Sequence, residues 1–220
     1  MASWLLLQLA DSAFPAGGFA HSGGLEAMMQ QGELEAPDAL RGFLEQALWQ
    51  TGRGALPLVS AAHADPGAHA ALDARADALL VSHVANRASR QQGRALLATA
   101  VRSFELPALA ALQREARAAG LATHHAPVFG AIAARLDLPA DETRQAFLHL
   151  QLRGLTSAAV RLGLLGPHEA QGLHFALGPL LTRVHDTCAP LGLDALAQTA
   201  PLLDLFGATH DRLYSRLFLS

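Results

Sequence analysis

Eleven histidines and one cysteine are the residues of this 220-residue chain with the most obvious capacity to bind a metal. His185 and Cys188 are three positions apart, a spacing that places both side chains on one face of a helix. A stable zinc site usually takes four ligands from cysteine, histidine or carboxylate side chains, and this pair supplies two. His185, Cys188 and His210 are therefore weak metal candidates. A buried thiol beside a helix-end histidine explains the pair more simply.

Sequence signatures of enzymes are missing. The chain has no G-x-S-x-G elbow, no phosphate-binding P-loop and no H-E-x-x-H zinc motif. The glycine-rich stretch 17–24 lacks the G-x-G-x-x-G spacing and follows a helix-like segment, so it predicts a flexible bend before a helix. Asp141 and Glu142 fall in the first turn of a predicted helix, where the helix dipole favours acids. We expect no catalytic residues and no tightly bound cofactor.

The composition predicts helices. The chain contains 46 Ala and 42 Leu but only seven Val and one Ile, and Ala and Leu favour helices whereas β-branched residues favour strands. All 16 basic residues are Arg, and the net charge of -3 argues against a general nucleic-acid binder. A single cysteine and the lack of an 18-residue apolar run predict a cytoplasmic protein without a membrane span. The low charged fraction of 16% indicates an apolar surface for a partner or a second copy.

We therefore expect an all-α fold, a multi-helix bundle that forms a single domain over residues 1–220. The clearest helix is amphipathic, with one apolar face made by Leu148, Leu152, Leu155, Ala159 and Leu162. Helix-opening prolines are predicted at Pro37, Pro66, Pro107, Pro127, Pro139 and Pro167, and helix-ending glycines at Gly52, Gly120 and Gly166. The predicted helices cover residues 3–10, 22–31, 38–51, 55–63, 66–84, 87–103, 106–119, 127–136, 140–164, 167–185, 194–205 and 208–217.

Three sequence blocks resemble the urease accessory protein UreF family. Residues 5–26 contain an L-L-Q-L run, a P-x-G-G-F bend and a G-L-E; residues 124–130 and 155–163 are similar to the family's H-x-P-V segment and its S-A-A-V-R-L-G helix. His210 and residues 215–220, S-R-L-F-L-S, resemble the family's C-terminus. The order and distances of these blocks cover the whole chain. Three positions depart from the family pattern: Thr209 and Leu219 stand where Arg is common, and Asp211 replaces Glu.

This resemblance implies a non-enzymatic, all-helical assembly factor. Family members join UreD (also called UreH) and the GTPase UreG on apo-urease, and the complex inserts nickel that it handles transiently. They tend to form homodimers, and their terminal segments help to dock UreD. The residues implied in partner binding are His210, Tyr214, Ser215, Arg216, Leu217, Phe218 and Ser220. Those implied in the structural bend are Pro15, Gly17, Gly18, Gly24 and Glu26.

Two hypotheses follow for the function. The first is a scaffold that holds a GTPase against its client enzyme. The alternative is a helical metal carrier or enzyme that uses His185 and Cys188. On the first hypothesis, Phe218→Ala weakens partner docking more than it lowers thermal stability. Gly18→Val is expected to disturb the bend by disfavouring a positive φ.

Overall fold

The computed structural model describes residues 4–35 and 38–220, and those residues form helices, turns and irregular segments without a strand. The predicted all-α fold is thus confirmed. The α-helices are α1 (Trp4–Leu9), α2 (Leu25–Gln30), α3 (Ala39–Gln50), α4 (Leu56–Ala64), α5 (His69–Leu79), α6 (His83–Phe104), α7 (Pro107–Ala118), α8 (His125–Arg135), α9 (Ala140–Arg161), α10 (Pro167–Ala176), α11 (Gly178–Cys188) and α12 (Pro201–Ala208). Short 3₁₀ turns are η1 (Gly18–Ala20), η3 (Pro66–Ala68), η4 (Leu193–Ala195) and η5 (His210–Arg212), and Thr51–Ala55 (η2) is a π-helical turn.

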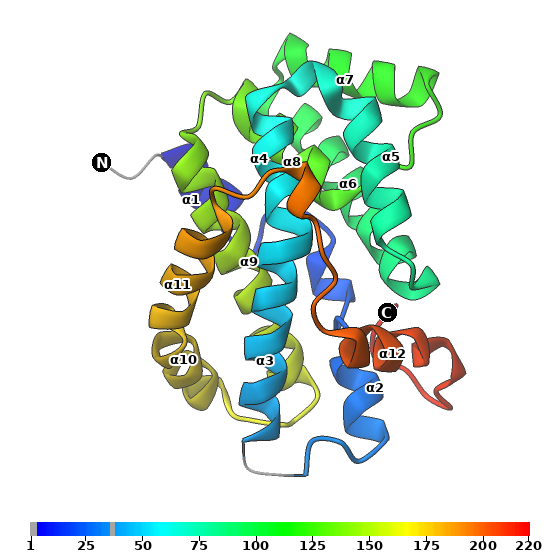
Figure 1. Cartoon of the computed structure of the whole chain (residues 1–220), viewed down its shortest axis with the longest axis vertical. Helices are drawn as coiled ribbons and strands as arrows, with labels where there is room; N and C mark the ends of the chain where they lie inside the picture. The colour runs from blue at the N-terminus through cyan, green and yellow to red at the C-terminus, as the bar shows by residue number, and fades with distance from the viewer. Residues whose placement is uncertain (1–3, 36–37) are drawn as a thin grey trace.

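A central column of helices organises the fold. Figure 1 shows α3 and α4 end to end in the middle of the molecule, with α10 and α11 on one side and α5 to α8 around its upper end. Helix α8 packs against α4 and α6, and its residues 126–133 are all buried. A helix that is buried around its whole circumference lies at the centre of a core. One cluster of buried apolar side chains extends from Leu9 to Phe218, so both ends of the chain join this core.

Two glycines allow α8 and the turn before it to approach their neighbours closely. A Cβ atom on Gly130 of α8 would lie 2.2 Å from the Val59 carbonyl oxygen of α4. A Cβ atom on Gly93 of α6 would lie 2.0 Å from the Thr123 carbonyl oxygen. These distances are far inside van der Waals contact, so only glycine fits at either crossing. The backbones of α4, α6 and α8 are therefore in direct contact.

Several predicted helices match the structure. The helix predicted over 140–164 is α9, which ends at Arg161, so Leu162 of the predicted apolar face lies just beyond it and is half-buried. Its predicted apolar positions Leu148, Leu152, Leu155 and Ala159 are buried. The opposite face of α9 is buried at Ala146 and half-buried at Leu150 and Ser157, because the helix also packs against α4, α8, α10 and α11. Pro66, Pro107 and Pro167 occupy the first turns of their helices as predicted. Pro37 and residue 3 lie outside the described residues.

Other predicted boundaries are wrong, and hydrogen bonds explain why. The helix expected over 66–84 ends at Leu79, because Ser82 begins α6 by accepting the Ala85 N–H at its hydroxyl. The stop expected at Gly52 does not occur, since the π-helical turn carries the chain from α3 into α4. The helix expected over 167–185 is instead two helices that meet at Leu177.

The helices expected over 194–205 and 208–217 also differ from the structure. Residues 196–200 are irregular, since the Ala197 N–H donates to the Arg53 carbonyl and the Ala200 N–H donates to the Gln50 side chain. The last helical hydrogen bond runs from the Leu213 N–H to the His210 carbonyl, and beyond it the chain is irregular to Ser220. None of the described helices is long and apolar enough to cross a membrane.

The close crossing of α4 and α8 gives the first prediction. We expect Gly130→Ala to lower the free energy of unfolding by about 1–3 kcal/mol, because the added methyl forces two backbones apart. Gly154→Ala in α9 is the matched control, since nothing lies within 4 Å of its missing Cβ. The control should gain about 0.5–1 kcal/mol from helix propensity. Urea denaturation measures both changes, and equal effects of the two substitutions would contradict the close approach.

Candidate functional site

The C-terminal tail, residues 210–220, runs beside the N-terminal bend, residues 15–26. The Leu219 N–H donates to the Ala20 carbonyl at 2.8 Å, and the Ser22 N–H donates to the Ser220 carbonyl at 2.6 Å. The Ser220 hydroxyl lies 2.6 Å from Nδ1 of His21. The tail and the bend thus hold each other through backbone bonds across almost 200 residues of sequence.

Glu26 is the main anchor of this contact. Its side chain is 2% exposed and lies in the first turn of α2. One carboxylate oxygen accepts the Leu217 N–H at 2.6 Å. The other accepts the Phe218 N–H at 3.2 Å and Nε2 of the fully buried His210 at 2.9 Å. A buried carboxylate is costly unless donors surround it, and here the tail supplies three donors.

Side chains of the tail alternate between the interior and the surface. Phe218 and Ser220 are each 4% exposed, whereas Leu217 is 54% and Leu219 is 60% exposed. Tyr214 projects fully into solvent. This alternation is what an extended segment produces when one of its faces is packed. Phe218, Ser220 and His210, three of the residues predicted to bind a partner, are therefore buried in this conformation.

Arg161 connects α9 to both the bend and the tail. Its guanidinium carbon lies 3.9 Å from the centre of the Phe19 ring and 4.2 Å from that of the Phe218 ring. The guanidinium group also donates to the Phe19 carbonyl oxygen. A cation held against two aromatic faces adds attraction beyond apolar burial. The second sequence block, through Arg161, thus contacts the first and the third.

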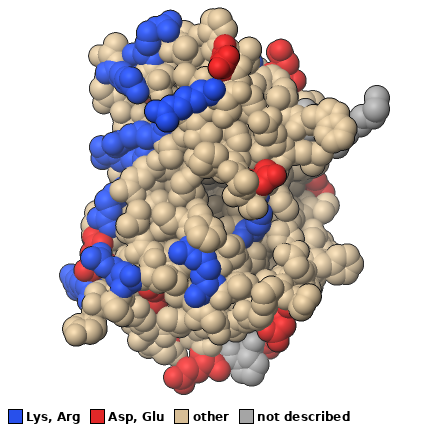
Figure 2. All heavy atoms as spheres, turned by 180° about the vertical axis from the view of Figure 1, so that it is seen from behind, with Lys and Arg blue, Asp and Glu red and all other residues tan. Residues whose placement is uncertain are grey.

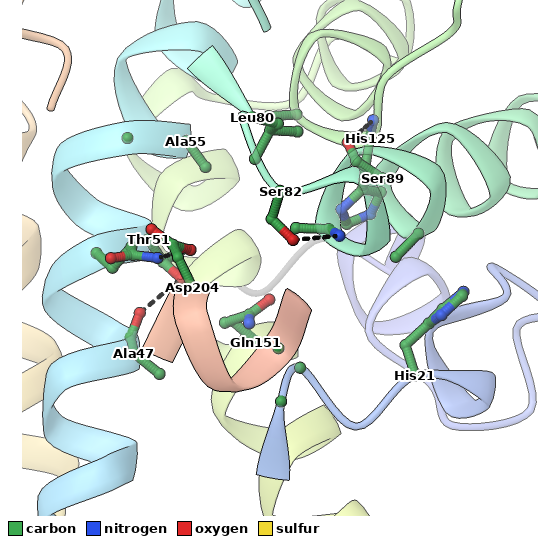
Figure 3. Close-up of a pocket in the computed structure, with 18 of the residues that line it drawn as sticks. His21, Ala47, Thr51, Ala55, Leu80, Ser82, Ser89, His125, Gln151 and Asp204 are labelled. Atoms are coloured by element: carbon green, nitrogen blue, oxygen red, sulfur yellow. Dashed lines mark hydrogen bonds between the residues drawn. The ribbon is translucent and has the colours of Figure 1, made fainter. Parts of the chain in front are cut away.

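All three sequence blocks line one cavity of about 240 Å³. Figure 3 shows His21 from the bend, His125 from the start of α8, and Gln151 and Asp204 around this space. Ser220 closes it from the tail, and its walls are mostly apolar. Burial, with a smaller contribution from Arg87, lowers the pKa of His21 to about 4. Burial also lowers the pKa of His125 to about 4, so both imidazoles are neutral at pH 7.

The predicted bend is present, with one correction. Positive φ angles occur at Gly17 (78°), Gly23 (62°) and Gly24 (94°), where only glycine is comfortable. Gly18 has no positive φ, so the expected reason for the effect of Gly18→Val is wrong. Pro15 continues the bend by accepting the Thr99 hydroxyl at its carbonyl. Sequence reasoning chose the right segment, including Gly17 and Gly24, but it also assigned a positive φ to Gly18, because spacing does not distinguish adjacent glycines.

The sequence did not predict a buried polar network around His124. Its Nε2 lies 3.0 Å from an Asp77 carboxylate oxygen, and its Nδ1 lies 3.1 Å from the Ser89 hydroxyl. Asp73 accepts the backbone N–H groups of Thr123 and His124. The Asp–His–Ser order resembles a hydrolase triad, but the Ser89 oxygen also accepts the His125 N–H. Ser89 thus acts as a cap that positions the start of α8, and no sequence motif signals it.

The three metal candidates do not form a common site. His185 lies between two carboxylates, 3.0 Å from Asp186 and 3.1 Å from Asp141. Cys188 is fully buried, and burial raises the pKa of its thiol. His210 is bonded to Glu26 in the tail. Within residues 4–35 and 38–220, no three His, Cys, Asp or Glu side chains gather to hold a metal ion.

Comparison with known proteins supplies the remaining observation. The family model described as UreF matches residues 34–178. The urease accessory protein F of Oryza sativa subsp. indica is 37% identical over 219 residues, which cover 98% of this chain and 84% of the relative. The Arabidopsis thaliana protein of the same name is 34% identical, covering 99% and 92%. Urease accessory protein UreF of Trichodesmium erythraeum is 32% identical, covering 97% and 94%.

Glu26 gives the second prediction. Glu26→Gln replaces one acceptor oxygen by an amide that faces the tail's N–H donors, so we expect a loss of about 1–3 kcal/mol in the free energy of unfolding. Glu45→Gln is the control, because Glu45 forms a surface ion pair with Arg41. That substitution should change the unfolding free energy by less than about 1 kcal/mol. Urea denaturation at pH 7 compares the two, and a Glu26 variant as stable as the control would refute the anchor.

The buried imidazoles give a prediction about pH. The pKa of His125 is about 4 when folded against 6.5 for an unperturbed histidine, so between these values the unfolded chain binds a proton that the folded chain does not. Stability therefore falls as the pH drops from 6.5 to 4. His125→Phe removes the titrating group and keeps a ring beside Phe129 and Phe147. Its unfolding free energy should depend less steeply on pH over this range.

The control for this experiment is His168→Gln, since His168 is exposed at the start of α10. The control should keep the slope of the wild-type chain. Identical slopes for the wild type and His125→Phe would contradict the lowered pKa, because they would mean that His125 binds its proton equally well in the folded and the unfolded chain.

Proposed function

The chain belongs to the UreF family of urease accessory proteins, and from this premise we propose that it scaffolds UreD (UreH) and the GTPase UreG on apo-urease. In this proposal the assembly inserts nickel into the urease active site, and GTP hydrolysis controls the release of the nickel. The chain itself works as a homodimer in the cytoplasm and contributes recognition rather than catalysis. Nickel is handled transiently by the complex, and no cofactor is tightly bound to this chain.

The docked tail is the observation that supports this proposal most directly. A scaffold needs surfaces of fixed shape, because flexible segments lose conformational entropy when they bind. Glu26, Arg161 and the bend hold the tail in one conformation while leaving Tyr214, Leu217 and Leu219 exposed. Exposed aromatic and apolar side chains beside arginines are the composition typical of the centres of protein interfaces.

The tail divides into residues that position and residues that contact a partner. His210, Phe218 and Ser220 face inward and fix its course. Tyr214, Ser215, Arg216 and Leu217 face outward, and we assign the contact with UreD to them.

Each of the three departures from the family pattern has a place in this arrangement. Asp211 keeps a carboxylate, which pairs with Arg87, His83 and Arg216 and so ties the tail to α6. Leu219 is 60% exposed, so an apolar side chain extends the outer face where relatives carry a cation. Thr209 donates its hydroxyl to the Phe206 carbonyl and accepts the Gln31 amide, which fixes the start of the tail.

A pair of variants tests the proposal. Tyr214→Ala with Leu217→Ala should weaken UreD binding at least tenfold, because side chains of this kind dominate interfaces. The melting temperature should stay within a few degrees of the wild type, since both side chains are exposed. Phe175→Ala is the control, because Phe175 is 84% exposed on α10, away from the tail. Titration of each variant with purified UreD measures the binding.

Two outcomes would contradict the proposal. Wild-type chain that binds neither UreD, UreG nor apo-urease would remove the scaffold function itself. Equal weakening by Phe175→Ala and by the tail variant would keep the scaffold but move the UreD contact away from the tail.

A further inference from the structure

Helices α6 and α7 carry a concentration of positive charge. Arg90, Arg94 and Arg102 follow spacings of four and eight along α6, which places them on one side of the helix. Arg114 and Arg117 are exposed on α7, which packs against α6. The Arg94 guanidinium reaches the Ala122 carbonyl just beyond the end of α7, so the two sets adjoin. We call these five residues the Arg ridge.

The Arg ridge keeps a net positive charge within the described residues. Helix α6 contains four arginines and no acidic residue over its 22 positions. Arg41, Arg87, Arg144 and Arg216 each form an ion pair with an acid, but none of the five ridge arginines does so in the part of the chain that the structure describes. Five of 16 arginines are thus gathered with only two acids, Glu105 and Glu115, next to them in the sequence, in a chain whose net charge is negative.

A separate group of acidic residues lies far from the ridge. Glu33, Glu35 and Asp38 are exposed near the connection between α2 and α3, at the opposite end of the molecule from α7. Figure 2 shows basic side chains from the upper left down the left side of this face, and acidic ones gathered along its lower end with a few at the top and right. Like charges gathered in this way repel one another, and a partner of opposite charge removes that repulsion.

We propose that the Arg ridge is a docking surface for an acidic face of another protein in the assembly. This inference rests on the proposed scaffold function and adds a second contact surface to the tail. The planar guanidinium group binds carboxylates through two parallel hydrogen bonds, so an arginine surface favours Asp and Glu side chains. The two packed helices form a rigid base, and the long arginine side chains extend the guanidinium groups from it.

Other occupants fit less well. Single-stranded nucleic acid usually binds through aromatic side chains between its cations, and the only aromatic residue in α6 or α7 is Phe104, which stacks on Phe14. Insertion into a membrane surface requires an apolar face beside the cations, and Leu106 is the one large apolar side chain exposed beside the ridge. The acidic end of a second copy would join the ridge head to tail, which builds open chains rather than a closed dimer.

The test reverses two charges of the ridge. Arg94→Glu with Arg117→Glu is compared with Arg183→Glu, an exposed arginine of α11 that also lacks an ion pair in the described residues. UreD, UreG and apo-urease are titrated separately with each variant at about 0.1 M and 0.5 M salt. For one of the three proteins, we expect the ridge variant to raise Kd at least tenfold at the lower salt and to reduce its dependence on salt. Circular dichroism should show an unchanged melting temperature.

The outcomes separate the ridge from the scaffold. Wild-type binding with an unchanged Kd for the ridge variant would overturn the ridge and leave the proposed function intact. Loss of binding in Arg183→Glu equal to that in the ridge variant would overturn the ridge as well. Ridge-dependent binding of duplex DNA or phosphatidylserine vesicles, with no effect on the three proteins, would replace the proposed occupant. A wild-type chain that binds none of the three would overturn both proposals.

Discussion

The structure depends on one buried carboxylate, that of Glu26. An ionised carboxylate inside a protein must be surrounded by donors, and Glu26 is served by two backbone N–H groups of the tail and by the His210 imidazole. This requirement joins residue 26 to residues 210–218, so the two ends of the chain are held together. The bend, the tail and the cavity between them follow from that closure, because each would lose its shape if the tail separated.

The helical core provides the rigid base for this closure. Glycines at the crossings of α4, α6 and α8 bring backbones into contact, and the N-terminus of α8 is fixed by Ser89 and Asp73. Helix α8 in turn places His125 in the cavity wall opposite the bend. Arg161 of α9 contacts the rings of Phe19 and Phe218, and so holds both rings against α9. The exposed side chains of the tail are thus held in place largely by buried and half-buried residues.

Sequence patterns predicted the fold class and most helices, because Ala and Leu at helical spacing indicate a helix independently of tertiary contacts. They failed where tertiary hydrogen bonds decide the conformation, as at residues 196–200 and 213–220, whose N–H groups bond to distant partners. The three family blocks identified the bend and the tail, but not that Glu26 joins them. The Arg ridge is visible in the sequence of α6 only after α7 is known to lie beside it, since its charges are spread over 28 residues.

The central claim is that the tail is docked on the bend in the free chain, before any partner arrives. Hydrogen–deuterium exchange of the backbone amides of Leu217, Phe218 and Leu219 tests it most directly, because each amide is bonded to Glu26 or Ala20. The account predicts that these amides exchange at least a hundredfold more slowly than in an unstructured peptide, an opening free energy of about 3 kcal/mol. Exchange at the unstructured rate in the isolated protein would contradict it.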